Sequence, residues 1–246
     1  MDNQVKNSVS LNEMVKAGVH LGHHTSKWHP KMKQYIYGSR HKLHIINLEH
    51  TQEKLEEALV FISKTVASGK TVLFVATKKQ AVPIVKEAAE SVEMPYAVKR
   101  WVGGTFTNFK NVIKRIRQLT QLEEKLAKGQ LQSYTKKERK VFQDKVEKGN
   151  KLFQGLKGMK EMPGVVFVED VMKDHLAIKE AQDMGIPVVA LTDTNANPES
   201  VDYPIPANDD AISSIQLIYG IVTDTIKEAK LAKKSGSQKE SLEETK

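Results

Sequence analysis

The chain of 246 residues contains no cysteine. Disulfide bonds, cysteine-ligated metal centres and cysteine nucleophiles are therefore excluded, and the composition suits a reducing compartment. No apolar run approaches the roughly 20 residues that a membrane-spanning helix requires. The first ten residues, MDNQVKNSVS, lack the apolar core of a secretion signal. We expect a soluble cytoplasmic protein, large enough to bury a core without covalent cross-links.

Signatures of enzyme active sites are also scarce. The motifs G-x-G-x-x-G, G-x-S-x-G and H-E-x-x-H do not occur. Gly69-Lys70-Thr71 resembles the end of a phosphate-binding loop, but Lys64 stands where that loop requires glycine, and a strand follows the segment instead of preceding it. The pairs Glu169-Asp170 and Asp209-Asp210 could hold magnesium or act as acid and base; we favour structural roles at a strand end and a helix N-cap. We predict no catalytic residue and no cofactor.

Positive charge is concentrated in two parts of the chain. The formal net charge is +8, yet residues 99–161 alone contain 17 Lys and Arg against 6 Asp and Glu. Residues 1–48 contain 7 basic residues against 2 acidic ones. Clustering of this kind predicts a polyanionic partner, RNA or DNA before an acidic protein or a membrane.

Short apolar runs alternate with amphipathic segments through most of the chain. Continuous apolar runs at 72–76, 165–168 and 187–191 are typical of buried parallel strands, and 96–98 forms a shorter one. Prolines restrict 201–206 to an edge strand. Helices are predicted over 49–68, from 81 to 91, over 175–184 and from 209 onward. The alternation predicts an α/β fold with a parallel sheet covered by helices on both faces.

The N-terminal part is less regular. Ser10 and Glu13 form a capping box that opens a short helix ending near Gly18. Residues 19–33 have no helical or strand period and are predicted to be a loop. Residues 35–37 and 43–46 could pair as a hairpin.

Two long helices interrupt the α/β alternation. One begins near Asn108 and ends at Gly129, and the other begins at the capping box of Thr135 and Glu138. Their apolar seams are Val112, Ile116, Leu119, Leu122 and Leu126, then Phe142, Val146, Gly149, Phe153 and Leu156. We predict an antiparallel helical hairpin about 30 Å long. Gly149 costs about 1 kcal/mol against alanine in a helix, and a close approach of the two helices would explain it.

Residues 99–110 join the body to this hairpin. A Gly103-Gly104 turn is flanked by Trp101, Phe106 and Phe109 together with hydroxyl, amide and cationic side chains. Small residues let a backbone approach a phosphate, and aromatic rings can stack on a base or a ribose. For each aromatic residue taken singly, a place in the interior is the alternative that we favour.

Six of the eight histidines lie between residues 20 and 44, which raises the question of a metal site. The loop that holds most of them supplies no carboxylate or thiolate to complete a ligand set. Histidines beside lysine, tryptophan and glycine are equally suited to contacts with RNA. We therefore predict no metal.

Five segments resemble the family of small-subunit ribosomal protein two, bacterial type. They are residues 18–23, 28–32, 74–80, 100–109 and 202–211. The segments occur in the order of the family, and the resemblance covers residues 10–228. One segment alone would be weak evidence, whereas the five together are specific.

The resemblance implies a flavodoxin-like, three-layer body with the helical hairpin inserted as a coiled coil. We expect the body at residues 1–107 and 161–232, the hairpin at 108–160 and a disordered polar tail at 233–246. The resemblance also implies a non-enzymatic role in translation on the cytoplasmic ribosome. There the chain would bind small-subunit ribosomal RNA near the junction of head and body, on the solvent side. Its other partners would be small-subunit proteins, including the mRNA-binding first protein, which the family helps to hold on the ribosome; no membrane is involved.

The predicted RNA-binding residues form three groups. Cations of the hairpin would bind phosphates: Lys110, Lys114, Arg115, Arg117, Lys136, Lys137, Arg139 and Lys140. The N-terminal loop would make a second contact through His23, Lys27, Trp28, Lys31 and Lys33. The third group lies where the hairpin leaves the sheet: Lys78, Lys79, Arg100, Trp101, Thr105 and Asn108.

Two other functional classes remain open at this point. A doubly wound sheet can also serve a nucleotide- or sugar-phosphate-binding enzyme, because such sheets bind ligands at the carboxyl ends of their strands. Alternatively, the chain is a protein-docking module that uses the hairpin as an arm, in which case its affinity for RNA would be weak and insensitive to salt.

Overall fold

The computed structural model describes the backbone of residues 10–243 and the side chains of residues 10–233. Its centre is a five-stranded parallel sheet in the order β5-β4-β6-β7-β8. The strands are β4 (Val72–Val75), β5 (Tyr96–Ala97), β6 (Val165–Val168), β7 (Val188–Thr192) and β8 (Tyr203–Pro206). The predicted parallel strands are confirmed. Strand β8 lies at the edge of the sheet, where Pro204 and Pro206 are tolerated although they cannot donate a hydrogen bond.

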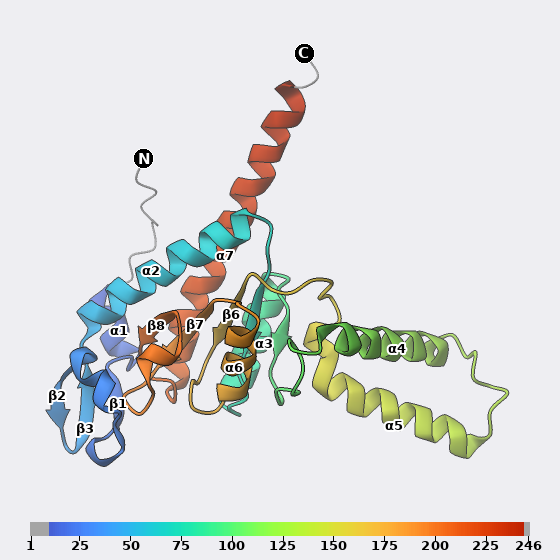
Figure 1. The fold of residues 1–246 in the computed structure, drawn as a ribbon, viewed down its shortest axis with the longest axis horizontal. Helices are drawn as coiled ribbons and strands as arrows, with labels where there is room; N and C mark the ends of the chain where they lie inside the picture. The colour runs from blue at the N-terminus through green and yellow to red at the C-terminus, as the bar shows by residue number, and fades with distance from the viewer. Residues whose placement is uncertain (1–9, 244–246) are drawn as a thin grey trace.

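Helices cover both faces of this sheet (Figure 1). Helices α2 (Leu48–Ala67), α3 (Ala81–Ser91) and α7 (Ile212–Glu243) cover one face, and α6 (His175–Asp183) covers the other. Successive strand residues supply the two cores, because side chains alternate across a sheet. Phe74 packs with Tyr219 of α7 on the first face, while Leu73 packs in the core of α6. This architecture confirms the predicted α/β class with a parallel sheet between layers of helices, and it is consistent with a flavodoxin-like fold.

Local sequence signals set the ends of the helices. Asn47 caps α2 by accepting a hydrogen bond from the amide of Glu49, and Gly69 follows the helix with a left-handed φ of 89°. The buried face of α2 contains Leu55, Leu59 and Ile62 at helical spacing, as the sequence predicts. In α3, proline 83 occupies the first turn, where no amide hydrogen is needed.

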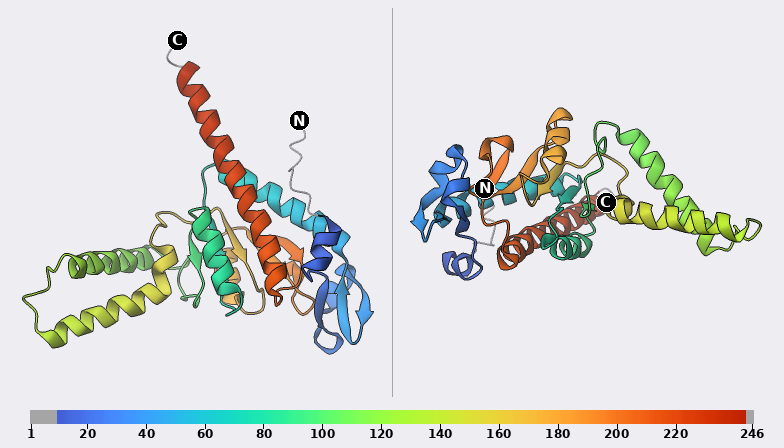
Figure 2. Two further views of the ribbon diagram at one scale, coloured as in Figure 1. Left: turned by 180° about the vertical axis from the view of Figure 1, so that it is seen from behind. Right: turned by 90° about the horizontal axis from the view of Figure 1, so that it is seen from below.

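Two further helices, α4 (Phe109–Ala127) and α5 (Lys136–Phe153), lie side by side and extend away from the sheet (Figures 1 and 2). We call residues 109–153 the arm. A Cβ atom added at Gly149 would lie 2.5 Å from Cδ1 of Leu119, so glycine is needed where α5 passes α4. The first turns of α4 are buried against the body through Val112, Ile113 and Ile116.

A second, smaller sheet lies at the opposite end of the molecule from the arm (Figures 1 and 2). Strands β2 (Ile36–Arg40) and β3 (Leu43–Ile46) form the predicted hairpin. The prediction of a loop over residues 19–33 is wrong in part, since Leu21–His24 form β1 and pair with β3. This strand has only four residues, includes glycine and pairs through an irregular register, so it leaves no alternating pattern in the sequence. The remainder of the loop contains two short 3₁₀ helices, Thr25–Lys27 and Pro30–Tyr35.

Helix α7 continues to Glu243, beyond residue 232 where we expect the body to end. Residues 1–9 and 244–246, which belong to the predicted body and tail, lie outside the described residues. Across the part of the chain that the structure covers, no helix combines the length and apolar character needed to cross a membrane.

Candidate nucleic-acid interface

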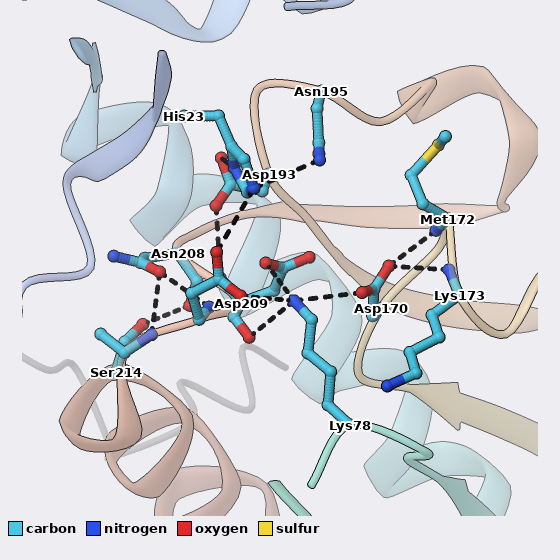
Figure 3. A network of polar contacts seen from close by, with 12 residues as sticks. His23, Lys78, Asp170, Met172, Lys173, Asp193, Asn195, Asn208, Asp209 and Ser214 are labelled. Carbon is cyan, nitrogen blue, oxygen red and sulfur yellow. Dashed lines mark hydrogen bonds and ion pairs between the residues drawn. The ribbon is translucent and has the colours of Figure 1, made fainter. Parts of the chain in front are cut away.

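Lys78 is the centre of a polar cluster at the carboxyl edge of the sheet (Figure 3). It follows β4, and its Nζ lies 2.7 Å from Asp209, 3.0 Å from Asp170 and 2.9 Å from Asp210. Its side chain is 13% exposed. Burial lowers the pKa of Lys78, but the attraction and hydrogen bonding of Asp209 and Asp210 outweigh it and raise the pKa well above the usual value. The ammonium is therefore permanently charged and neutralised within the protein.

His23 joins the same cluster from β1. Its Nδ1 lies 3.0 Å from Asp193, and its Nε2 lies 3.3 Å from Asp210. The hydrogen bond to Asp193 raises the pKa of His23, and the charges of Asp209 and Asp210 act in the same direction. The position of β1 is fixed by the backbone as well, because the amide of His23 donates to the hydroxyl of Thr194 at 2.8 Å.

The cluster contains more carboxylates than cations. Burial, together with repulsion from Asp193, raises the pKa of Asp209 to about 7. Glu169 is completely buried, and neither of its carboxylate oxygens has a hydrogen-bond partner among the described residues. Burial raises its pKa to about 9, against the attraction of Lys78. Glu169 is therefore protonated at neutral pH.

Three side chains of the cluster have atoms suited to a metal ion. His23, Asp193 and Asp209 each offer one possible ligand atom, and these three atoms lie within 4.8 Å of one another. Histidine with two carboxylates is a ligand set known for divalent metals. The sequence analysis considered the histidine loop and the acidic pairs separately, whereas the fold brings the carboxylates of Asp193 and Asp209 to His23. The same atoms also take part in the ion pairs described above.

The pair Glu169-Asp170 lies at a strand end, as predicted. The predicted N-cap role of Asp209-Asp210 is wrong, because these carboxylates pair with Lys78 and His23. Asp170 follows β6 and accepts hydrogen bonds from the amides of Met172 and Lys173, at 2.8 and 2.9 Å. Asp209 bonds Lys78. The turn before α7 is closed by Asn208, whose side chain accepts from the amides of Asp210 and Ala211. Phosphates bind poorly beside so many carboxylates, so the edge where a nucleotide would lie on this type of sheet is unsuited to one.

Residues 101–107 are fixed by Glu180 of α6. Its carboxylate accepts hydrogen bonds from the indole of Trp101 at 3.1 Å, from the amide of Gly104 at 2.8 Å and from the amide of Phe106 at 3.0 Å. Burial opposes ionisation, but these hydrogen bonds lower the pKa of Glu180 below its usual value. Trp101 and Thr105 are consequently buried, in agreement with the preference for interior aromatics. No sequence pattern marks Glu180, which lies inside an ordinary helix.

Other predicted residues near this turn are at the surface. Lys79, Arg100 and Asn108 are exposed. Lys78, in contrast, is largely buried among the aspartates and is not accessible in the same way. The third predicted group is thus divided, with Lys79, Arg100 and Asn108 accessible and Lys78, Trp101 and Thr105 held inside.

The arm presents its predicted cations to solvent. Seven of them are exposed and make no ion pair with a carboxylate of the described residues: Lys110, Lys114, Arg115, Arg117, Lys136, Lys137 and Arg139. Lys140 is also exposed, but it pairs with Asp144 at 3.0 Å. The arm therefore has a surface of uncompensated positive charge.

The N-terminal group lies at the other end of the molecule (Figure 2). Lys27, Trp28, Lys31 and Lys33 are exposed, and His23 is partly buried in the cluster. Lys31 forms an ion pair with Glu199. The fold thus holds two separate basic surfaces, on the arm and on the small sheet, with the acidic cluster between them.

Comparison with known proteins shows the relatives of the chain. The model of the family described as Ribosomal protein S2 matches residues 14–229. The small ribosomal subunit protein uS2 of Roseiflexus castenholzii is 45% identical over 227 residues, which are 92% of this chain and 86% of that protein. The protein of the same name from Coprothermobacter proteolyticus is 44% identical over 240 residues, covering 96% and 90%. That of Chloroflexus aggregans is 42% identical over 238 residues, covering 97% and 100%. The match extends over the body and the arm alike, and the chain therefore belongs to the ribosomal protein S2 family, a family of structural ribosomal components and not of enzymes.

Proposed function

We propose that this chain is a structural component of the small subunit of the cytoplasmic ribosome and binds ribosomal RNA through the arm. The observation that carries the proposal is the set of seven exposed arm cations without a carboxylate partner in the described residues. Unpaired cations on a projecting surface release the counterions of a nucleic acid when they bind its phosphates. The names of the relatives, proteins of the small ribosomal subunit, identify the expected RNA.

The arm serves this function as an inserted, antiparallel helical hairpin of the coiled-coil type. Its seam residues face inward, since Val112, Ile116 and Leu119 are buried, while Lys114 and Arg117 between them are exposed. This division leaves one side of α4 free for phosphates. The proposed domain boundaries are those predicted from the sequence. The hairpin comprises residues 108–160, and the body comprises residues 1–107 and 161–232.

The proposal includes a protein partner. By family membership, the body would help to dock the mRNA-binding first protein of the small subunit, as well as contact its neighbouring ribosomal proteins. The acidic cluster between the two basic surfaces supports a protein-binding role for this part of the body, because a region rich in carboxylates is unsuited to RNA. Of the acidic residues in the cluster, Asp210 is the exposed one, with 53% of its side chain accessible.

The test measures binding to small-subunit ribosomal RNA as a function of salt. The variant Lys114→Glu, Arg117→Glu removes two phosphate contacts, and the slope of log affinity against log salt should fall by somewhat under one unit for each. The control Lys173→Glu, Lys179→Glu makes the same change of charge at exposed positions on and beside α6, and its slope should match wild type. An arm variant with the wild-type slope would refute the proposal. Weak, salt-insensitive binding by the wild-type chain would instead favour a protein-docking module.

A further inference from the structure

The small sheet has a basic surface that also exposes aromatic side chains, and in this it differs from the arm. Between Met14 and Leu48 the chain contains no aspartate or glutamate. Lys27, Lys33, Arg40 and Lys42 are exposed there, and none of the four pairs with a carboxylate of residues 10–233. The positive charge of this surface is therefore available to a ligand from outside.

Two aromatic side chains are exposed among these cations. The ring of Tyr37 is 80% exposed, and Trp28 is 38% exposed. Trp28 lies beside His44 of β3, with ring centroids 5.5 Å apart. Large aromatic side chains are normally buried, because they contribute the most apolar area to a core. Their exposure beside lysine and arginine is typical of a surface on which bases stack.

A bulge in the hairpin explains the position of Tyr37. Ile36 pairs with Ile46 and Gly38 pairs with Ile45, so two steps along β2 correspond to one step along β3. Tyr37 is the extra residue and has no partner across the hairpin. Bulges of this kind redirect a side chain and are frequent next to functional sites.

The turn of the hairpin shows a second irregularity. His41 and Lys42 both have left-handed backbone conformations, with φ of 51° and 64°. A two-residue turn of this geometry strongly favours Asn-Gly, because other residues are strained there. The chain nevertheless places an imidazole and an ammonium group at the tip. Strained backbone conformations that persist are concentrated at functional sites.

The exposed groups all lie on the hairpin or on the segment bonded to its tip. The amide of Thr25 donates to the carbonyl oxygen of Lys42 at 2.9 Å, which joins the segment of Lys27 and Trp28 to the tip of the hairpin. We define the hairpin surface as Lys27, Trp28, Tyr37, Arg40, His41 and Lys42. It combines stacking groups with phosphate-binding groups over a short span of backbone.

We propose that the hairpin surface binds unpaired nucleotides of RNA, with Tyr37 and Trp28 stacking on bases and Lys27, Arg40 and Lys42 holding phosphates. The inference deepens the proposed RNA-binding function and rests on it. Stacking requires bases that are not already stacked and paired within a duplex, so exposed rings distinguish this surface from the arm, whose cations suit a duplex backbone. The free edge of β2 would also accept an extended peptide, but that mode requires no cluster of cations.

The experiment uses the full chain and a short, unstructured RNA labelled at one end. Tyr37→Leu removes the ring but keeps an apolar side chain, and it should weaken binding about tenfold. Tyr37→Phe keeps the stacking face and should bind as wild type does. Because Tyr37 is exposed and unpaired, neither change disturbs the core. The pair Arg40→Glu, Lys42→Glu should weaken binding and reduce its salt dependence, whereas the matched pair Lys173→Glu, Lys179→Glu should not.

Tryptophan fluorescence supplies a direct signal of stacking. The chain has two tryptophans, Trp28 and Trp101, and Trp101 is buried. Unstructured RNA should quench the emission of Trp28, and Trp28→Phe should abolish the change. Equal affinities for Tyr37→Leu, Tyr37→Phe and wild type, without quenching, would overturn the inference.

Two further outcomes keep this inference distinct from the proposed function. If the wild-type chain binds neither duplex nor unpaired RNA, the proposed function itself fails. If it binds RNA with the arm-dependent salt slope but the hairpin variants reduce only incorporation into small subunits, the hairpin surface binds a protein and the inference is wrong.

Discussion

The indole of Trp101 donates a hydrogen bond of 3.1 Å to Glu180, and through this contact α6 holds the turn from which the arm begins. The same carboxylate accepts from the amides of Gly104, Phe106 and Thr107. A single buried side chain thus satisfies donors that the body otherwise leaves without partners. The orientation of the arm depends on a residue that lies outside it.

Glu180→Gln should therefore loosen this turn. Glutamine keeps the size of the side chain but replaces one acceptor oxygen by a donor that faces backbone amides, at a cost of about 1–3 kcal/mol. Urea unfolding followed by tryptophan fluorescence would measure the loss of stability. The neighbouring exposed Lys179→Gln is the control and should be neutral. Wild-type stability of Glu180→Gln would show that the hydrogen bonds contribute little.

Glu169 makes stability depend on pH. Its pKa is about 9 in the folded chain against an ordinary value of 4.5 in the unfolded chain, so folding takes up a proton between these pH values. The stabilising contribution of the protonated side chain is complete below pH 4.5 and is lost as pH rises through 9. Stability should fall by up to about 1.4 kcal/mol per pH unit in this interval.

Glu169→Gln imitates the protonated acid and removes this dependence. At pH 7 the variant should be more stable than wild type by an amount on the order of 3 kcal/mol, and the difference should shrink as pH falls toward 4.5. Chemical denaturation at several pH values would measure both. Glu87→Gln, at an exposed position on α3, is the control, and its difference in stability from wild type should not vary with pH. A constant difference between Glu169→Gln and wild type across this range would contradict the assignment.

The sequence predicts the body well because its signals are local. Continuous apolar runs mark β4, β6 and β7, and the capping boxes at Ser10 and Thr135 mark the starts of α1 (Leu11–Lys16) and α5. The prolines of β8 predict its edge position. Each of these features depends on a residue and its near neighbours, so no tertiary information is needed.

The polar cluster depends on tertiary contacts and could be predicted only in parts. Asp193 follows the predicted strand at 187–191, but its partner His23 is 170 residues away. Lys78 is predicted as an RNA-binding residue from its position after a strand, and nothing nearby in sequence reveals the three aspartates around it. Charge counts identify basic segments but not which individual cations the fold neutralises.

Two glycines in helices give opposite expectations for the same substitution. An alanine Cβ at position 149 of α5 would lie 2.5 and 2.7 Å from the methyl carbons of Leu119, so packing should outweigh the gain of up to about 1 kcal/mol in helix propensity. At Gly220 of α7 an added Cβ meets no atom within 4 Å. Gly149→Ala should destabilise the chain, and Gly220→Ala should stabilise it. Thermal unfolding of both would check the contrast, and stabilisation by Gly149→Ala would show that the arm helices separate readily.

Replacing the strained residue in the turn of the hairpin by glycine should stabilise the chain but weaken its binding to RNA. Lys42 has a φ of 64°, where glycine avoids a cost of about 1 kcal/mol, so Lys42→Gly should raise stability. Glu93 has a similar φ of 50° at the end of α3, away from the basic surfaces, and Glu93→Gly should raise stability too. Only Lys42→Gly should also weaken binding of unstructured RNA, since it removes a phosphate-binding ammonium. Denaturation and binding titrations on the two variants separate the effects: if Lys42→Gly gains stability and keeps full affinity, the residue at this tip has no role in binding, and strain there needs another explanation.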